Sequence, residues 1–254
     1  LRMKKEIRGK TEMKALACAA LTFSILAGCS MPGTHEATSG DEYRALLASP
    51  LRTERDHTFD ERRYPAELLQ FADVRPGMRV LDIATGGGYT SQLLALAVGP
   101  SGKLWAQTPQ PGAALKERMA AHPQANFIVT ARPFDDPVPP EAAPLDVVTL
   151  ILNYHDISYL PVDRDAMNRK IFAALKPGGR YVIVDHSALA GTGISAGKTV
   201  HRIEEAFVVA EVKRAGFVLD REASFMRNAA DKRDDSSAPP KVTDKFVLRF
   251  VKPR

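Results

Sequence analysis

The chain has 254 residues, of which 44% are hydrophobic and 26% are charged, a composition that excludes an intrinsically disordered chain or a disulfide-dense miniprotein. Of its 35 basic and 30 acidic residues, six and two lie in the first 28 positions, which leaves 29 and 28 in the remainder. The net charge of +5 therefore belongs mostly to the N-terminal segment, and we expect no nucleic-acid partner.

Residues 1–28 have the pattern of an export signal. A short basic start, Met13-Lys14, precedes about a dozen apolar or small residues from Ala15 to Leu26. At 1.5 Å per residue such a run covers about 18 Å, which is too short for a hydrocarbon core of about 30 Å, so we predict the apolar region of a signal peptide. The Leu-Ala-Gly-Cys sequence that ends at Cys29 resembles the lipobox of bacterial lipoproteins. We expect a lipid on Cys29.

Residues 29–50 are predicted to tether this lipid to a domain over 51–254, with a short helix at Tyr43–Leu47 as an option. Ser30 follows the cysteine, where an Asp would retain a lipoprotein at the inner membrane, so we expect an outer-membrane anchor facing the periplasm. Translation from Met31 would instead give a cytoplasmic protein. Because Cys18 and Cys29 are the only cysteines, the domain has no disulfide and no thiolate metal site.

The elements expected in the domain alternate between apolar strands and helices. Helices are predicted over 65–73, Tyr89–Val98, Gly112–Ala121, Arg164–Leu175 and Val200–Ala215. Strands are predicted at Arg79–Ile83, Lys103–Gln107, Asn126–Val129, Leu145–Leu152, Arg180–Asp185, Phe217–Leu219 and Phe246–Val251. Continuous apolar strands separated by helices indicate a parallel sheet covered on both faces. Since the last two strands are joined by a polar loop without a helix, we predict a single doubly wound α/β domain whose mostly parallel, seven-stranded sheet has an antiparallel last strand.

The strongest local signal is the glycine turn Gly86-Gly87-Gly88, between a predicted strand and a predicted helix. Such turns let the backbone approach a ligand at the carboxyl end of a strand. The dinucleotide fingerprint G-x-G-x-x-G is not matched, because Ser91 occupies its last position. A P-loop ending at Gly197-Lys198-Thr199 also fails, because Thr192 stands at its first glycine. A tight turn without a ligand is the alternative.

The stretch from Asp82 to Gly88 resembles motif I of the class I, Rossmann-like S-adenosylmethionine-dependent methyltransferases, with Ala84 at the first glycine of that motif. Leu175-Lys176-Pro177-Gly178-Gly179 is similar to their turn before strand five, and the likeness extends over about residues 60–252. Pro76–Asp82, the Gly-Gly-Gly-Tyr-Thr turn and Asn153–Asp156 resemble a narrower group of predicted bacterial methyltransferases that often carry signal peptides.

This resemblance implies S-adenosylmethionine as cofactor. The residues that it implies for binding the donor are Asp82, Ala84, Gly86, Gly88, Tyr89, Gln107, Asp135 and Asn153. Gln107 stands where the family usually has an acidic residue that binds both ribose hydroxyls, and an amide accepts these bonds more weakly than a carboxylate. Asp135 and its neighbour Asp136 are alternatives for the adenine contact, and Tyr89 offers an aromatic face to the sulfonium.

Polar residues at the ends of the fourth and fifth strands are the candidates for chemistry. We predict His155 as the general base, oriented by Asp156, with a bond from His155 to the loop backbone as the alternative. Predicted substrate contacts are Tyr154, Asp185, His186 and His201, and Arg227-Asn228 are similarly placed. We expect no resident metal, although a divalent cation between Asp156, Asp185 and His186 is an alternative.

The sequence thus predicts an exported, lipid-anchored protein that transfers a methyl group from S-adenosylmethionine to a small molecule. The donor is a cytoplasmic metabolite, and Ala84 and Gln107 depart from the family pattern. The alternative is therefore a lipoprotein without activity that uses a methyltransferase-like domain to bind another ligand or a partner. The sequence predicts no oligomeric state.

Overall fold

The computed structural model describes residues 40–254; the predicted signal peptide and Cys29 lie outside these residues. The first described helix, α1 (Gly40–Leu46), packs on the domain through Tyr43, which is 1% exposed and donates a hydrogen bond of 2.8 Å to the carbonyl of Val74. The folded domain therefore includes α1, ahead of the boundary that we expected at residue 51.

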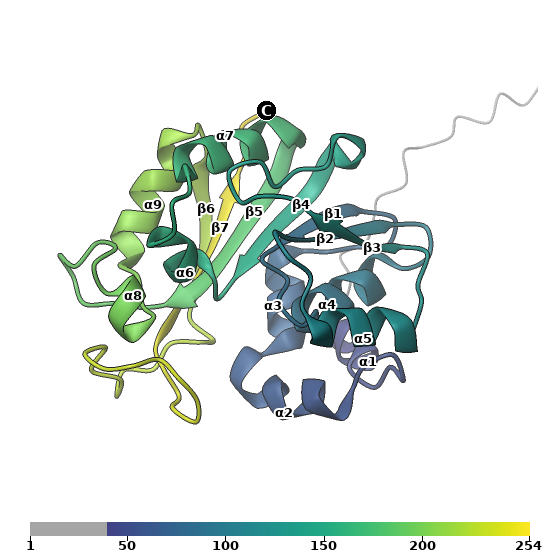
Figure 1. The fold of residues 1–254 in the computed structure, drawn as a ribbon, viewed down its shortest axis with the longest axis horizontal. Coiled ribbons are helices and arrows are strands. Elements are labelled where there is room, and N and C mark those ends of the chain that lie inside the picture. The colour runs from purple at the N-terminus through teal and green to yellow at the C-terminus, as the bar shows by residue number, and fades with distance from the viewer. Residues whose placement is uncertain (1–39) are drawn as a thin grey trace, which may run out of the picture. The chain divides into compact units, whose positions relative to one another are not determined.

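A seven-stranded sheet forms the centre of the domain (Figure 1). In chain order its strands are β1 (Arg79–Ile83), β2 (Lys103–Thr108), β3 (Phe127–Ala131), β4 (Leu145–Ile151), β5 (Leu175–His186), β6 (Val218–Ala223) and β7 (Lys245–Val251). Their spatial order is β3-β2-β1-β4-β5-β7-β6, in which β1 to β5 pair in parallel and β7 lies antiparallel between β5 and β6. The predicted fold class is confirmed.

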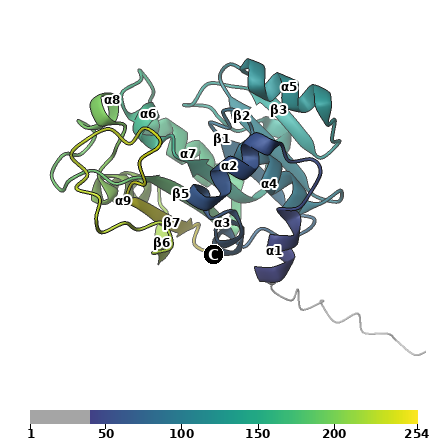
Figure 2. The same ribbon diagram turned by 90° about the horizontal axis from the view of Figure 1, so that it is seen from below.

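Helices cover both faces of this sheet (Figure 2). One face packs against α1, α3 (Pro65–Ala72), α4 (Tyr89–Val98) and α5 (Ala113–Ala121). The other packs against α6 (Tyr154–Ser158), α7 (Arg164–Ala174) and α9 (Glu205–Arg214). Side chains of a strand alternate between the two cores, as Val80 and Leu81 do, which explains why the strands are continuously apolar in sequence.

The strands β5 and β6 are longer than predicted, since β5 begins at Leu175 and β6 ends at Ala223, and three other segments differ in kind or position from the predicted elements. Glu54–Arg63 forms a polar helix, α2, whose first turn is closed by reciprocal hydrogen bonds between Thr53 and Asp56. The polar segment after β4 folds into α6 instead of remaining a loop. The helix predicted from Val200 begins only at Glu205. A separate short helix, α8 (Gly197–Val200), ends at Val200, because His201 takes a left-handed backbone conformation (φ 53°).

Arg202 and the long loop between β6 and β7 are held together by buried ion pairing. The Arg202 guanidinium is fully buried and donates to both carboxylate oxygens of Asp231, at 2.8 and 3.1 Å. This pair fixes the loop over the carboxyl edge of the sheet, where its later residues line a cavity described below. Within residues 40–254, no helix has the length and apolarity that spanning a membrane requires.

Candidate functional site

The first of two cavities lies beside the glycine turn, at the carboxyl ends of β1 and β4. It encloses about 620 Å³, within the range of roughly 300–1,000 Å³ that is usual for small-molecule sites. We call it the glycine-turn cavity. Of the predicted donor contacts, it is lined by Asp82, Ala84, Gly86, Tyr89 and Asn153. Residues of α2 and α5 complete its wall: Arg55, Asp56, Phe59, Arg63, Ala114, Glu117, Arg118 and Ala121.

Asp82 at the end of β1 is buried and bonded within the protein. Its carboxylate accepts hydrogen bonds from the hydroxyl of Ser91 at 2.5 Å and from that of Thr149 at 2.7 Å. Burial raises the pKa of Asp82 to about 6, although these two hydrogen bonds act in the opposite direction. Asp82 therefore ties the start of α4 to β1 and β4, and so holds the glycine turn between them.

Gln107 braces the turn and does not line the cavity, which corrects its predicted contact with the donor. Its side chain is fully buried, its amide oxygen accepts from the N–H of Ala84 at 3.1 Å, and its amide nitrogen donates to the carbonyl of Arg132 at 2.6 Å. The bond to Ala84 supports that residue in a left-handed conformation (φ 58°), which side chains other than glycine's disfavour. An amide serves here because one end must accept and the other must donate.

Gly88 is required by a neighbouring arginine, and it also does not line the cavity. A Cβ at Gly88 would lie 3.0 Å from Cδ of Arg118. That arginine donates to the carbonyl of Gly87 at 2.9 Å and to both carboxylate oxygens of Asp56, at 2.9 and 2.6 Å. Burial would raise the pKa of Asp56, but the bonds and charge of Arg118 lower it below its usual value. The sequence analysis missed this pair, which joins α2 to α5 across the turn.

The remaining donor predictions have mixed outcomes. Asp135 is exposed and lines neither cavity, and its neighbour Asp136 pairs with Lys170 at 2.7 Å, so this predicted adenine contact is not assembled. Tyr89 lines the glycine-turn cavity and its hydroxyl donates to Asp60 at 2.8 Å. Asn153 also lines the cavity, and its amide donates to the carbonyl of Ile151 at 2.9 Å.

The second cavity, which we call the histidine cavity, encloses about 290 Å³. It is lined by Phe59, Arg62, Arg63, Leu152, His155, His186, His201, Ser237, Ala238, Pro239, Lys241, Thr243 and Lys245. Phe59, Arg63 and Leu152 line the glycine-turn cavity as well, so the two cavities adjoin at these residues. Three of the predicted catalytic or substrate residues, all of them histidines, thus come together in one cavity.

His155 is held by two carboxylates. Its Nδ1 lies 2.6 Å from Asp185, which also accepts from the His155 backbone N–H at 2.8 Å, and its Nε2 lies 3.3 Å from Asp156. Burial would lower the pKa of His155, but the charges and hydrogen bonds of Asp185 and Asp156 outweigh it and raise the pKa to about 10. Because both ring nitrogens face carboxylates, the protonated form of His155 is favoured, which argues against its predicted role as general base.

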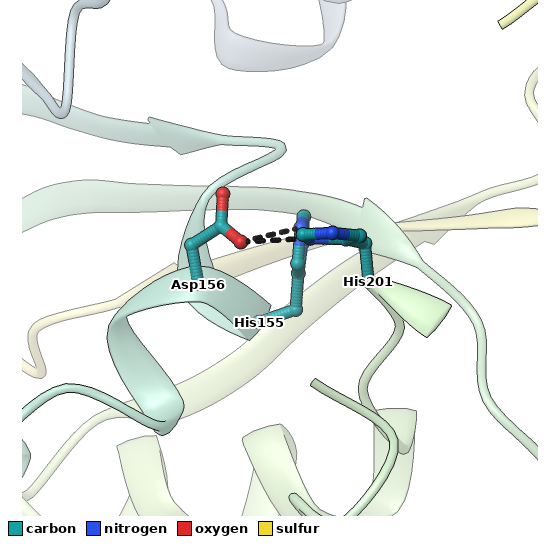
Figure 3. Close-up of side chains that lie close together, drawn as sticks. All are labelled: His155, Asp156 and His201. Carbon is teal, nitrogen blue, oxygen red and sulfur yellow. Dashed lines mark hydrogen bonds and ion pairs between the residues drawn. The ribbon is translucent and has the colours of Figure 1, made fainter. Parts of the chain in front are cut away.

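Asp156 links His155 to His201 (Figure 3). Its Oδ1 lies 3.1 Å from Nδ1 of His201, and one ligand atom from each of the three residues falls within 4.8 Å of the others, a spacing that a metal ion would accept. Asp185, predicted as a substrate contact and alternatively as a metal ligand, is fully buried and lines neither cavity; it accepts from the backbone N–H groups of His155 and His186, which corrects the predicted substrate contact.

The other predicted substrate residues divide between cavity and core. His186 lines the histidine cavity, its Nδ1 lies 2.7 Å from the hydroxyl of Thr243, and burial lowers its pKa to about 3, so it is neutral. Tyr154 is a core residue: its hydroxyl donates to Glu211 at 2.7 Å and accepts from Asn168 at 2.9 Å, which corrects its predicted substrate contact. Arg227 and Asn228 line neither cavity.

Comparison with solved structures shows which fold this arrangement of strands and helices belongs to. A crystal structure of an S-adenosylmethionine-dependent methyltransferase from Aquifex aeolicus superposes with a TM-score of 0.56 over 84% of this chain and 98% of its own, at 18% identity. The sheet order, the antiparallel β7 and the glycine turn after β1 agree with that likeness. The chain has the class I methyltransferase fold.

Sequence comparisons reach parts of this methyltransferase fold. Residues 36–120 match the model of the protein-L-isoaspartate(D-aspartate) O-methyltransferase family. A protein-L-isoaspartate O-methyltransferase of Methanothermobacter thermautotrophicus is 35% identical over 63 residues, 25% of this chain and 29% of that protein. A ubiquinone/menaquinone biosynthesis C-methyltransferase UbiE of Burkholderia orbicola is 28% identical over 132 residues, half of each chain. The chain thus spans half or less of the length of these relatives.

Proposed function

We propose that the protein transfers a methyl group from S-adenosylmethionine, bound in the glycine-turn cavity, to a small molecule bound in the histidine cavity. The observation that carries this proposal is that the two cavities adjoin at Phe59, Arg63 and Leu152 on the carboxyl edge of the sheet. Ligands of doubly wound sheets bind at this edge. Two neighbouring cavities satisfy a reaction that needs two molecules aligned and shielded from water.

The glycine turn fits the donor. A Cβ on Gly86 would lie 4.0 Å from the carbonyl oxygen of Ala84, and one on Gly87 would make an ordinary contact of 3.6 Å with Cβ of Ala114, so neither position is closed by a clash within the protein. Bound there, the donor supplies an electrophilic methyl group on a positively charged sulfur. Phe59 and Tyr89, whose ring centroids are 5.8 Å apart, give the cavity aromatic wall, and the guanidinium of Arg63 lies over both rings, at 5.2 and 5.0 Å from their centroids. Asp82, Gln107 and Arg118 hold the turn itself.

The residues of the histidine cavity restrict which acceptors can react there. Both ring nitrogens of His155 face carboxylates of the protein, Asp185 and Asp156, so this side chain is not available to remove a proton from the acceptor. His186 is neutral, and its low pKa makes it a weak base. An acceptor that enters already ionised, or with a free lone pair, needs no base and suits this cavity.

Calorimetric titration with S-adenosylmethionine tests the proposal. We expect wild type to bind and Gly87→Val to lose binding, because a side chain at Gly87 enters the cavity from a backbone that is not in the left-handed region. Gly112→Val carries the same side chain at a position outside the cavity with no atom within 4 Å of the added Cβ, and should bind normally. Equal binding by both variants, or none by wild type, would contradict the proposal.

The sequence pattern of residues 1–29 further supports export with a lipid on Cys29, at the outer membrane facing the periplasm. Cys29→Ser should release the protein from the membrane fraction, whereas Cys18→Ser should leave it there. A Cys29→Ser protein that stays membrane-bound would overturn the anchor.

Export separates the protein from a donor made in the cytoplasm, which favours one alternative: an exported lipoprotein that uses the same cavities to bind another ligand or a partner. The calorimetric titration also tests this alternative, because a protein that binds another ligand should give no heat with S-adenosylmethionine.

A further inference from the structure

Three cations of the histidine cavity, Lys245, Arg62 and Arg63, have no carboxylate within ion-pair distance among the described residues. Lys245 is only 7% exposed, and its ammonium makes one hydrogen bond, of 3.2 Å, to the carbonyl of Thr243. Burial and the charges of Arg63 and Arg62 lower the pKa of Lys245, although the charges of Asp244 and Asp231 act in the opposite direction. These three cations of the cavity therefore have room for an anionic partner that the protein does not supply in direct contact.

Other cations in the domain are treated differently. The buried guanidinium groups of Arg118 and Arg202 each form two hydrogen bonds to an aspartate. Lys241, which lines the same cavity as Lys245, pairs with Asp231 and Asp235. An unpaired buried ammonium is costly, and the cost is relieved when an anion binds beside it. Lys245 therefore marks a place that is built for a negative charge.

Lys245 lies in the wall of the cavity in which we propose that the acceptor binds. It is the first residue of β7 and pairs in register with His186, the last residue of β5. Arg62 and Arg63, at the end of α2, line the cavity from another element. No acidic residue is among those that line the cavity, while Phe59, Leu152, Ala238 and Pro239 give it apolar wall.

We propose that the histidine cavity binds a small organic anion, with its charged group at Lys245, Arg62 and Arg63 and its apolar body against Phe59 and Leu152. This inference rests on the proposed function in one respect: it makes the anion the methyl acceptor. The cluster of His155, Asp156 and His201 offers an alternative occupant, a metal ion. A divalent cation would enter a cavity lined by two lysines and two arginines, whose charges oppose it and favour an anion.

Benzoate and benzamide provide a matched pair of probes, because they share a shape and differ in charge. Histidine-selective NMR of the full chain locates them: of its six histidines, His155, His186 and His201 line the histidine cavity, His122 lines the glycine-turn cavity, and His57 lines neither. Benzoate should shift the signals of His186 and His201 and leave that of His57 unchanged. Benzamide should bind at least about tenfold more weakly.

Two substitutions on β7 or just beyond it test the recognition. Lys245→Met should weaken benzoate binding about tenfold or more, whereas Lys252→Met, just beyond the opposite end of the strand, should leave it unchanged. Arg62→Gln, a half-buried side chain without a hydrogen bond in the described structure, should also weaken binding and serves if Lys245→Met fails to fold.

Several outcomes would overturn the anion site: equal binding of benzoate and benzamide, binding unaffected by Lys245→Met and Arg62→Gln, or no shift at about 20 mM benzoate. Loss of benzoate binding after treatment with EDTA would assign the cavity to a metal instead. S-adenosylmethionine added to the same samples should shift His122. Benzoate binding without that shift would remove the methyl donor and keep the anion site, so the two proposals fail separately.

Discussion

The glycine-turn cavity and the histidine cavity adjoin and differ in how the polar groups around them are satisfied. Around the glycine turn, Asp82, Gln107 and the pair of Asp56 and Arg118 are each bonded to other protein groups. In the histidine cavity, Lys245 and two arginines have no carboxylate partner among the described residues. The polar residues that hold the glycine turn are satisfied within the protein, whereas Lys245, Arg62 and Arg63, the last of which lines both cavities, carry charge that a ligand would satisfy. This difference teaches that a buried polar residue near a cavity is evidence for a ligand only when its bonds within the protein are incomplete.

The largest expected effect comes from the region around the glycine turn, whose polar groups are bonded within the protein. Arg118→Met leaves Asp56 buried without its partner and should lower the free energy of unfolding by about 3–5 kcal/mol, measured by urea denaturation. Arg55→Met, an exposed position on α2 without an ion pair, should change it by less than about 0.5 kcal/mol. A loss below about 1 kcal/mol for Arg118→Met would show that the pair does not hold α2 over the turn.

The charge of His155 in the histidine cavity should appear in the pH dependence of the free energy of unfolding. The pKa of His155 in the folded protein, about 10, lies above the value of 6.5 expected when it is unfolded. Its contribution is therefore fully present below pH 6.5 and is lost as pH rises through 10, for a total of about 3–5 kcal/mol. In His155→Gln the free energy of unfolding should fall less between these two pH values than it does in wild type.

His186 is the control for this experiment, because burial lowers its pKa to about 3. An NMR pH titration should show the ring signals of His186 unchanged above about pH 5 and those of His155 changing only near pH 10. If His155 titrates near pH 6.5, it is free to act as a general base and the original sequence prediction is restored.

An intermediate effect is expected at Gln107. Gln107→Glu introduces the carboxylate that the methyltransferase resemblance would place there, but this side chain faces Ala84 and Arg132 and not the cavity. The affinity for S-adenosylmethionine should change less than about twofold, and stability should fall by about 1–3 kcal/mol because the donor to the Arg132 carbonyl is lost. Binding that tightens about tenfold would show that position 107 does contact the donor.

The smallest effect concerns Ala84. Ala84→Gly removes the side chain from a left-handed residue, and this gain is partly offset by the greater freedom of glycine in the unfolded chain. We expect stability to rise by up to about 1 kcal/mol in urea denaturation. A loss of stability would mean that contacts of the Ala84 methyl group in the core outweigh its backbone strain.

The sheet could be predicted from the sequence because its strands are apolar on both faces and alternate with helices along the chain. The helix Tyr89–Val98 and the strand Arg79–Ile83 were predicted with the bounds that the structure has. The helix α2 was missed because it is almost entirely polar; the Thr53-x-x-Asp56 capping pattern was its available signal.

The site was harder to predict, since it depends on which way side chains point. Gln107 and Lys245 are both polar residues at strand ends, and only the three-dimensional structure separates the one that braces backbone from the one that lines a cavity. Tyr154 and His155 are neighbours in sequence, yet one packs in the core and the other lines the histidine cavity. Distant pairs such as Asp56 and Arg118 leave no local pattern at all.

A crystal structure of the chain with S-adenosylmethionine tests the central claim most directly. We predict the donor in the glycine-turn cavity, along the backbone of Gly86 and Gly87, and open to the histidine cavity where the two adjoin. A donor bound elsewhere, or a glycine-turn cavity that stays empty at saturating donor, would contradict the account.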